Sequence, residues 1–269
     1  MSSESDNAHH GTAAATASDP PSDHLRVRDL TMAYGSFVLQ RDLNFSIVRG
    51  DVFIIMGGSG CGKSTLLKHL IGLKEPAKGE VFYGDESFTA ASPERRGEIL
   101  RGVGVTYQSG GLWSSMTLAE NIGVPLGEYT DLSPAEIRDV ASLKLALVGL
   151  GGFEDYYPSQ ISGGMQKRAG LARAIALDPE VLFFDEPSAG LDPISSHLLD
   201  DLILELRDSL GATIIVVTHE LASIFAIGNN CVFLDAKTRT MIADGDPNYL
   251  KDHAEHPDVR KFLHRGEEA

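Results

Sequence analysis

A glycine-rich stretch near residue 60 has the residue types that hold phosphate groups. It consists of Gly57, Gly58, Ser59, Gly60, Cys61, Gly62, Lys63 and Ser64, in the pattern G-x-x-x-x-G-K-[ST]. Glycines let successive backbone N–H groups turn inward around phosphate oxygens, and the following helix presents its positive end to the same anion. Lys63 would place a compact charge on the β- and γ-phosphates of a nucleotide, and Ser64 would offer its hydroxyl to Mg²⁺. A strand before the stretch and a helix after it favour a phosphate site over a glycine-rich turn.

Two further residues of this region, Thr65 and Cys61, could have a structural role instead of binding the nucleotide. Thr65 could assist Ser64 at the nucleotide, and the alternative is a packing or capping role. Cys61 is expected to fill space, because a thiolate beside phosphate groups would repel them. Both are kept among the predicted nucleotide-binding residues.

Two adjacent carboxylates, Asp185 and Glu186, close the apolar strand that starts at Val181. Such a strand is typical of one buried on both faces, and in a parallel sheet its carboxyl end opens beside the phosphate loop. Asp185 would hold Mg²⁺, directly or through water. Glu186 would reach the attacking water as general base. The alternative is an acidic strand end in a turn before Pro187.

A histidine closes another apolar strand. His219 follows residues 214–218 and would lie at the same edge of the sheet. There it could hydrogen-bond the γ-phosphate or orient the water, and a structural role is the alternative.

A second anion-binding helix start lies about a hundred residues after the first. Ser162 is a good N-cap, and Gly163 and Gly164 leave backbone N–H groups exposed. One nucleotide does not need both helix starts. A dimer in which the second site of each chain covers the nucleotide of the other explains the pair, and a capped helix with a flexible start is the alternative.

The order of these motifs resembles the ATP-binding cassette (ABC) family, and the match spans about residues 25–244. The motifs are Tyr34, the Gly57–Ser64 loop, Gln108, Ile161–Met165, Asp185–Glu186, Ser188–Asp192 and His219. The family's usual signature is Leu-Ser-Gly-Gly-Gln, so Ile161 replaces Leu and Met165 takes the Gln position, while the Ser-Gly-Gly core is intact. Met165 could tune the interface or simply pack.

The resemblance implies ATP hydrolysis with Mg²⁺ as cofactor. It implies that Tyr34 stacks on adenine, that Ser162 and Gly164 bind the γ-phosphate in trans, and that Asp192 couples the two sites. The implied catalytic set is Lys63, Gln108, Glu186 and His219, and the implied metal set is Ser64, Gln108 and Asp185.

Three segments further resemble the Mla/Mce lipid-transport ATPases of the MlaF type. They are residues 108–122, the Ser-Gly-Gly-Met signature and the ending at residues 256–263. This resemblance implies phospholipid or other lipid transport, at the cytoplasmic face of the bacterial inner membrane. The implied partners are a second copy of the chain, an MlaE-like permease, an MCE-domain lipid-binding subunit and a small STAS-domain regulator.

Two hypotheses concern contacts with these partners. Val259, Phe262 and Leu263 could pack on the partner ATPase, and the alternative is an amphipathic end folded onto its own chain. Leu112 and Trp113 could form part of the socket for a permease helix, and a buried core Trp is the alternative.

Three rival functions remain open on the sequence. The chain could serve a transporter of another solute, because specificity lies in the membrane subunits. An ABC ATPase acting on DNA or ribosomes usually carries a long insertion or two cassettes, and this chain has neither. A regulatory module without hydrolysis is disfavoured by Glu186 and His219.

The elements that must position these residues alternate between strands and helices. That order predicts an α/β fold with a mainly parallel sheet and a helical subdomain inserted at about residues 108–177. The resemblance to the ABC family implies that this is the ABC-type phosphate-loop fold, with an additional antiparallel β subdomain. We expect a disordered tail over residues 1–24, the ATPase domain over 25–245 and a C-terminal extension over 246–269. The expected strands are 25–33, 39–48, 51–56, 79–83, 103–107, 181–184 and 213–218, and the expected helices are 63–71, 134–148, 164–176, 194–209 and 220–226, followed by a β-rich piece that ends at residue 243.

Composition agrees with a globular ATPase that is not a nucleic-acid binder. The formal charge is −15 and no long run of Lys or Arg is present, whereas proteins that grip nucleic acid usually carry a basic face. The two cysteines, Cys61 and Cys231, lie far apart and outside any CxxC pattern, which excludes a disulfide framework. No signal peptide or run of ~20 apolar residues is present, so a membrane role would require partner subunits.

Overall fold

The computed structural model of the protein describes residues 22–108 and 110–265. Most of the predicted disordered tail, residues 1–21, lies outside the described residues, as do residues 266–269 of the C-terminal extension. Strand β1 begins at Asp23, two residues before the expected start of order at Leu25.

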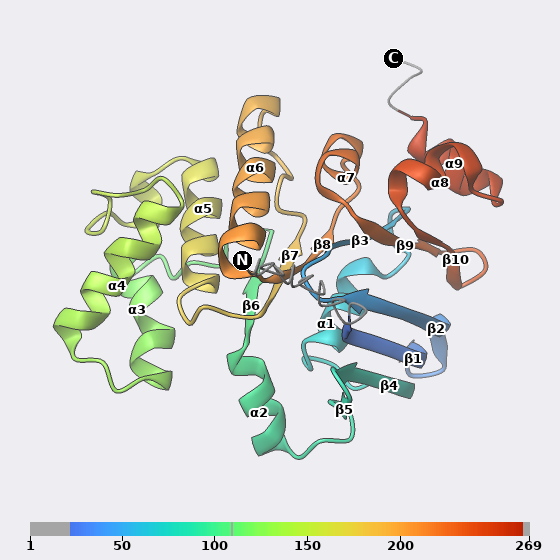
Figure 1. The fold of residues 1–269 in the computed structure, drawn as a ribbon, viewed down its shortest axis with the longest axis horizontal. Coiled ribbons are helices and arrows are strands. Elements are labelled where there is room, and N and C mark those ends of the chain that lie inside the picture. Colours follow the sequence, from blue (N-terminus) through green and yellow to red (C-terminus); the bar gives the residue numbers. More distant parts are fainter. Residues whose placement is uncertain (1–21, 109, 266–269) are drawn as a thin grey trace, which may run out of the picture.

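A six-stranded sheet forms the centre of the molecule (Figure 1). Its order is β10-β9-β3-β8-β7-β6, with β10 antiparallel and the other five strands parallel. The strands are β3 (Val52–Gly57), β6 (Val103–Thr106), β7 (Val181–Asp185), β8 (Thr213–Val217), β9 (Asn230–Asp235) and β10 (Thr240–Gly245). Every residue of β3 and β8 is buried, as expected for strands covered on both faces. Because these strands are parallel, their carboxyl ends meet at one edge, where Asp185, Glu186 and His219 lie.

A four-stranded antiparallel sheet of order β2-β1-β4-β5 packs beside the central sheet. Its strands are β1 (Asp23–Tyr34), β2 (Phe37–Val48), β4 (Lys78–Tyr83) and β5 (Glu86–Ser87). One face is apolar and shares a hydrophobic cluster with α1 (Lys63–Leu70) and with one face of the central sheet. Phe45 of β2 stacks on Phe53 of β3, with 5.4 Å between ring centroids.

The remaining helices comprise a lobe at one side, helices such as α6 (Pro193–Leu210) and α7 (Leu221–Ile227) that cover the sheet, and α2 (Pro93–Arg101) near β5 and β6 (Figure 1). Helices α3 (Leu118–Tyr129), α4 (Pro134–Leu147) and α5 (Gly163–Ala174) form the lobe, away from the antiparallel sheet (Figure 1). The others are α8 (Pro247–His253) and α9 (Pro257–Leu263), with a 3₁₀ turn at Pro158–Gln160. Capping boxes start α3 at Thr117 and α4 at Ser133, which explains why both begin sharply after polar loops.

The sheet and helix predictions are confirmed, with ends that differ by one or two residues. The residue pattern gave no bounds for α2, β5, α8 and α9, which are short or lie in charged segments, nor for α3 within the predicted helical subdomain. The predicted β-rich piece ending at residue 243 corresponds to β9 and β10. The fold class of an α/β ABC-type ATPase is confirmed by this architecture.

The C-terminal helix packs on its own chain. Val259, Phe262 and Leu263 are buried in the larger hydrophobic cluster of this chain, and Phe262 meets Phe233 of β9 edge-on with 5.1 Å between centroids. The hypothesis that these three side chains contact a partner ATPase is therefore wrong, and the alternative of an end folded onto its own chain is right. The C-terminal extension supplies apolar contacts that stabilise its own fold, at about 25 cal/mol per Å² of apolar surface buried.

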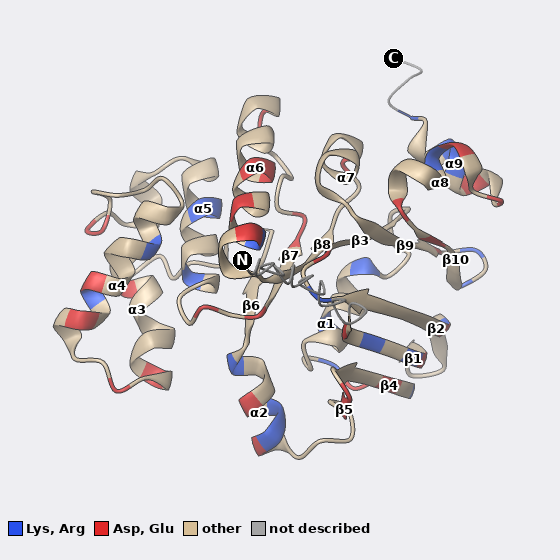
Figure 2. Ribbon diagram, viewed as in Figure 1, with Lys and Arg blue, Asp and Glu red and all other residues tan. Residues whose placement is uncertain are grey.

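Charged residues of both signs are interspersed along most of the elements (Figure 2). Arg95 and Arg96 of α2, for example, pair with Glu86 and Glu75. Within the described residues, no helix combines the length and the apolar character needed to cross a membrane.

Candidate active site

The phosphate loop leaves the buried strand β3 and enters α1. Gly57, Gly60 and Gly62 have φ angles of +146°, +75° and +104°, which L side chains rarely adopt. Gly57 also has no room for a side chain, because a Cβ atom would lie 2.3 Å from the carbonyl oxygen of Leu234. The sequence pattern of glycines thus corresponds to a backbone that only glycine can follow at these positions.

Lys63 curls back over this loop. Its Nζ donates to the carbonyl oxygen of Gly57 at 3.1 Å and to that of Gly58 at 3.4 Å. Cys61 is buried, and burial raises the pKa of its thiol, so the side chain stays neutral. The expectation that Cys61 fills space is confirmed.

Ser64 and Asp185 come together across the edge of the sheet. The hydroxyl of Ser64 donates to Oδ1 of Asp185 at 2.9 Å, although the residues are 121 positions apart. Two oxygen atoms at the mouth of a phosphate loop fit a hard cation such as Mg²⁺, whose other ligands would come from phosphate and water. Among the described residues, no cluster of three or more His, Cys, Asp or Glu side chains could hold a metal without such help.

Glu186 and His219 form a pair beside this site. Nδ1 of His219 lies 3.0 Å from Oε1 of Glu186 with hydrogen-bond geometry, and 2.9 Å from Oε2 without it. Oε2 is buried and has no hydrogen-bond partner among the described residues. Glu186 has a φ of +50°, a strained value for a non-glycine residue, and its N–H donates to Val217 O at 2.8 Å. A buried oxygen with a free lone pair, on a backbone held in an unusual conformation, suits a base that receives a proton.

Tyr34 lies over the start of α1. Its hydroxyl is 3.3 Å from Oγ1 of Thr65, and Nζ of Lys74 lies 3.4 Å from its ring centroid. The side chain is 50% exposed. These contacts place the ring near the phosphate loop, and the contact of Thr65 with Tyr34 is a packing role of the kind that the sequence left open. An adenine could stack on the face that Lys74 does not cover.

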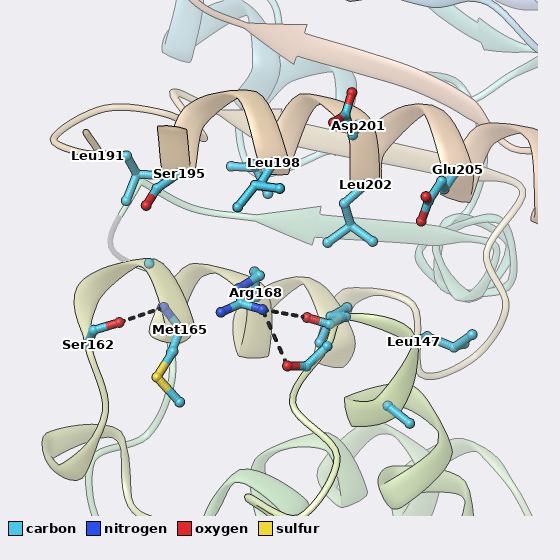
Figure 3. Close-up of a pocket in the computed structure, with 15 residues that line it drawn as sticks. Leu147, Ser162, Met165, Arg168, Leu191, Ser195, Leu198, Asp201, Leu202 and Glu205 are labelled. Atoms are coloured by element: carbon cyan, nitrogen blue, oxygen red, sulfur yellow. Dashed lines mark hydrogen bonds between the residues drawn. The ribbon is translucent and has the colours of Figure 1, made fainter. Parts of the chain in front are cut away.

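The second predicted anion site does not belong to this pocket. Ser162 caps α5, and its Oγ accepts from the N–H of Met165 at 3.3 Å. The start of α5 lies in the helical lobe and well apart from α1 in Figure 1. Ser162, Gly164 and Met165 instead line a groove of about 480 Å³ between α5 and α6 (Figure 3). The two predicted phosphate-binding helix starts are therefore separate from each other within one chain.

Asp192 and Gln108 lie at the start of α6 and just after β6. Oδ1 of Asp192 accepts from the N–H groups of Ile194 and Ser195, so its carboxylate caps α6. The hydrogen bond from the Ser195 side chain is the main reason why the pKa of Asp192 is lowered. Gln108 is exposed just after β6, at the same carboxyl edge as Asp185.

Sequence reasoning missed a buried amide that supports the phosphate loop. Nε2 of Gln40 donates to the carbonyl oxygen of Cys61 at 2.7 Å and to that of Asp235 at 2.9 Å. Gln40 sits in β2, where nothing in the residue pattern indicates a contact with a loop 21 positions away. It links the antiparallel sheet to the loop, and only the tertiary structure reveals it.

The fold and the phosphate loop together define a phosphate-loop nucleotide hydrolase. The family model described as "ABC transporter" matches residues 40–189. The chain is 40% identical over 250 residues to the "probable ribonucleotide transport ATP-binding protein mkl" of Mycobacterium tuberculosis (strain ATCC 25618 / H37Rv), which covers 93% of this chain and 69% of that protein. It is 36% identical over 237 residues to the "intermembrane phospholipid transport system ATP-binding protein MlaF" of Escherichia coli (strain K12), covering 88% of this chain and 87% of MlaF.

Solved structures agree with these matches. The cbiO1 subunit of Clostridium perfringens, part of the ABC transporter complex cbiONQ, has a TM-score of 0.78 and 27% identity, over 92% of this chain and 97% of that one. A dimeric post-hydrolysis state of the ATP-binding cassette MJ0796, bound to ADP and Pi, has a TM-score of 0.75 and 28% identity, over 82% and 98%. The chain belongs to the ABC transporter family, as an ATP-binding subunit whose ATP hydrolysis is coupled to transport.

Proposed function

We propose that this chain powers a lipid transporter of the Mla/Mce type, as a homodimer on the cytoplasmic face of the bacterial inner membrane. The observation that carries the dimer is the divided site. Lys63, Asp185 and Glu186 gather at the sheet edge, while Ser162 and Gly164 start a helix in the other lobe. Two copies facing each other would complete two sites, and the similar cassette MJ0796 is described as a dimer.

The lipid assignment is supported by a relative and by sequence. MlaF is described as part of an intermembrane phospholipid transport system, and the chain aligns with 87% of its length. The mycobacterial relative mkl is described as a probable ribonucleotide transport protein, so a transporter of another solute is the second candidate. The two candidate functions differ in the substrate that the assembled transporter carries. Co-purification with an MlaE-like permease, an MCE-domain subunit and any STAS-domain regulator, followed by lipid extraction, distinguishes them, because phospholipid bound in stoichiometric amount favours the first.

The residues at the sheet edge have complementary roles in this proposal. Lys63 binds the β- and γ-phosphates, and Ser64 and Asp185 with Gln108 hold Mg²⁺. When bound, Mg²⁺ neutralises charge on the phosphates. Tyr34 stacks on adenine, Ser162 and Gly164 of the second copy cover the γ-phosphate, and Asp192 connects the two sites.

Glu186 acts as the general base in this proposal, with His219 as its orienting partner. The buried Oε2 of Glu186 accepts the proton of the attacking water, while Oε1 is held by Nδ1 of His219 at 3.0 Å. Removal of such a base raises the barrier by about 3–5 kcal/mol, or ~10²–10⁴ in rate.

The test is Glu186→Gln. We expect ATP binding to persist, hydrolysis to fall by about 10²–10⁴-fold, and an ATP-bound dimer to accumulate in size-exclusion chromatography. Glu220→Gln is the matched control, since Glu220 is an exposed carboxylate whose Oε1 lies 3.8 Å from Nε2 of His219. A Glu186→Gln protein that hydrolyses ATP at the wild-type rate would remove Glu186 from this role.

The permease would dock near Trp113. This side chain is 48% exposed, so the alternative of a buried core Trp is wrong, and the Arg173 guanidinium lies 5.2 Å from the ring centroid. Trp113, Val124 and Tyr129 line a cavity of about 480 Å³ between α3 and the sheet.

A crosslinking experiment tests this docking site. Both native cysteines are buried, so Trp113→Cys introduces an accessible thiol. We expect it to crosslink to permease loops in the active complex, whereas Tyr249→Cys, at an exposed position of α8, should not. Equal crosslinking from both positions, or none from position 113, would contradict the proposed socket.

A further inference from the structure

Lys167, in the second turn of α5, reaches the segment that follows the predicted base. Its Nζ donates to the carbonyl oxygen of Pro187 at 2.7 Å and to that of Ala189 at 2.5 Å. These carbonyls belong to the segment between Glu186 and Asp192. A bond from an ammonium group to a carbonyl is charge-assisted and stronger than a neutral one.

The segment itself has few other constraints. Glu186 has a left-handed backbone, and short turns connect Ala189 to Glu186 and Leu191 to Ser188. The buried hydroxyl of Ser188 has no hydrogen-bond partner among the described residues. The two bonds from Lys167 therefore contribute much of what fixes this segment to the helical lobe.

The side chain of Lys167 has little freedom to point elsewhere. It borders a small void of about 10 Å³ together with Leu171, Phe184, Pro187 and Leu199. Burial lowers the pKa of Lys167, and the negative charge of Glu186 acts in the opposite direction. An ammonium confined in this way holds a defined position.

The start of α5 also lies close to the same segment at a second point. A Cβ atom on Gly164 would lie 3.7 Å from Cδ2 of Leu191, which is ordinary van der Waals contact. Figure 3 shows Leu191 above the start of α5, on the side of the groove formed by α6. The helix start that would cover the nucleotide of the second copy thus lies beside the segment that carries the base of its own chain.

We propose that Lys167 is a positioning residue that links the two ATP sites of the dimer, an inference that rests on the function proposed above. Nucleotide seated on Ser162–Gly164 fixes the start of α5, and Lys167 transmits that position to Pro187 and Ala189. Glu186 in the other site then takes its working orientation. Occupancy of one site by ATP is thereby required for full activity in the other.

The test compares substitutions of two neighbouring basic residues in the full chain, assembled with its transporter partners. Lys167→Met keeps the aliphatic stem and removes the donors, and Lys167→Arg restores donors. Arg168→Met is the matched control, because Arg168 also donates to two backbone carbonyls, but those of Val148 and Gly149 at the end of α4 rather than those of the segment after Glu186 (Figure 3). The readouts are the ATP dependence of hydrolysis, equilibrium binding of a fluorescent ATP analogue, and the melting temperature.

We expect Lys167→Met to lower kcat by about 10²-fold, the effect of misplacing a catalytic group by ~1 Å. ATP binding should change little, and the Hill coefficient should fall from near 2 towards about 1, since cooperativity is bounded by the number of coupled sites. Lys167→Arg should recover part of the lost kcat and part of the lost cooperativity. Arg168→Met should lower the melting temperature and keep the cooperativity.

Two outcomes separate failure of this inference from failure of the proposed function. Cooperative wild-type hydrolysis with an unchanged Hill coefficient in Lys167→Met would overturn the link while leaving the dimer intact. Non-cooperative hydrolysis by a monomeric wild-type protein would overturn the dimer itself, and the inference with it. Equal loss of cooperativity in Arg168→Met would show a general effect of loosening α5, and would also overturn the specific role of Lys167.

Discussion

A backbone contact between α5 and the segment after Gln108 gives a sharp prediction. Gly170 of α5 faces Gly110, and a Cβ atom added to Gly170 would lie 2.5 Å from the oxygen and 3.0 Å from the Cα of Gly110. Gly110 cannot simply retreat into a relaxed conformation, because its φ of +75° is one that glycine favours. Gly170→Ala should therefore displace Gly110 and, with it, the nearby Gln108.

The magnitude follows from two opposing effects. Alanine is favoured over glycine inside a helix by about 1 kcal/mol. Overpacking against a rigid neighbour costs about 1–3 kcal/mol. Gly170→Ala should thus leave the free energy of unfolding unchanged or lower it by up to about 2 kcal/mol.

Gly97 provides a matched control in another helix. It lies inside α2, is exposed, and has no atom within 4 Å of an added Cβ. Gly97→Ala should raise the free energy of unfolding by about 1 kcal/mol, which corresponds to a melting temperature roughly 2–4 °C higher for a chain of this size. The assay is thermal unfolding of the two variants and the wild type, followed by ATP hydrolysis, which should fall only for Gly170→Ala.

One result would refute the close approach of α5 to this segment. If Gly170→Ala raised the melting temperature as much as Gly97→Ala and kept wild-type hydrolysis, the position would behave as an ordinary exposed helix residue. The contact with Gly110 would then be wrong.

Two further predictions concern a carboxylate and a buried imidazole. Asp185→Asn can still accept from Ser64 but loses the charge, so the Mg²⁺ concentration for half-maximal hydrolysis should rise by about 10–100-fold in a metal titration, and an unchanged requirement would contradict a metal role. Burial lowers the pKa of His24 to about 4, while Nδ1 lies 2.6 Å from Oγ1 of Thr213. In the unfolded chain the His24 imidazole has a pKa of about 6.5, so it binds a proton at pH values where the folded chain keeps it neutral. The stability that neutral His24 provides is therefore fully present above pH ~6.5 and is lost as the pH falls towards ~4. Urea unfolding should show that the free energy of unfolding of the wild type is about 2 kcal/mol lower at pH ~5 than at pH ~7.5, and His24→Gln should not show this decrease. An equal decrease in both proteins would exclude His24 as the cause.

The sequence alone determined the chemistry of the site and the class of the fold. The phosphate loop, the pair of carboxylates and the strand-end histidine are recognisable because each is a short local pattern attached to an apolar strand. Parallel strands bring their carboxyl ends to one edge whatever their order, so even the meeting of Ser64 with Asp185 was implied before any coordinates.

Only the tertiary structure decided which distant residues support these motifs. The amide of Gln40 under the phosphate loop, the ammonium of Lys167 on the Pro187 segment and the burial of Phe262 in its own chain depend on how separate layers meet. A side chain's partner across such a junction is set by strand register and helix rotation, which residue spacing within one element does not contain. For the same physical reason, the C-terminal helix was open to two interpretations on sequence and has one place in the fold.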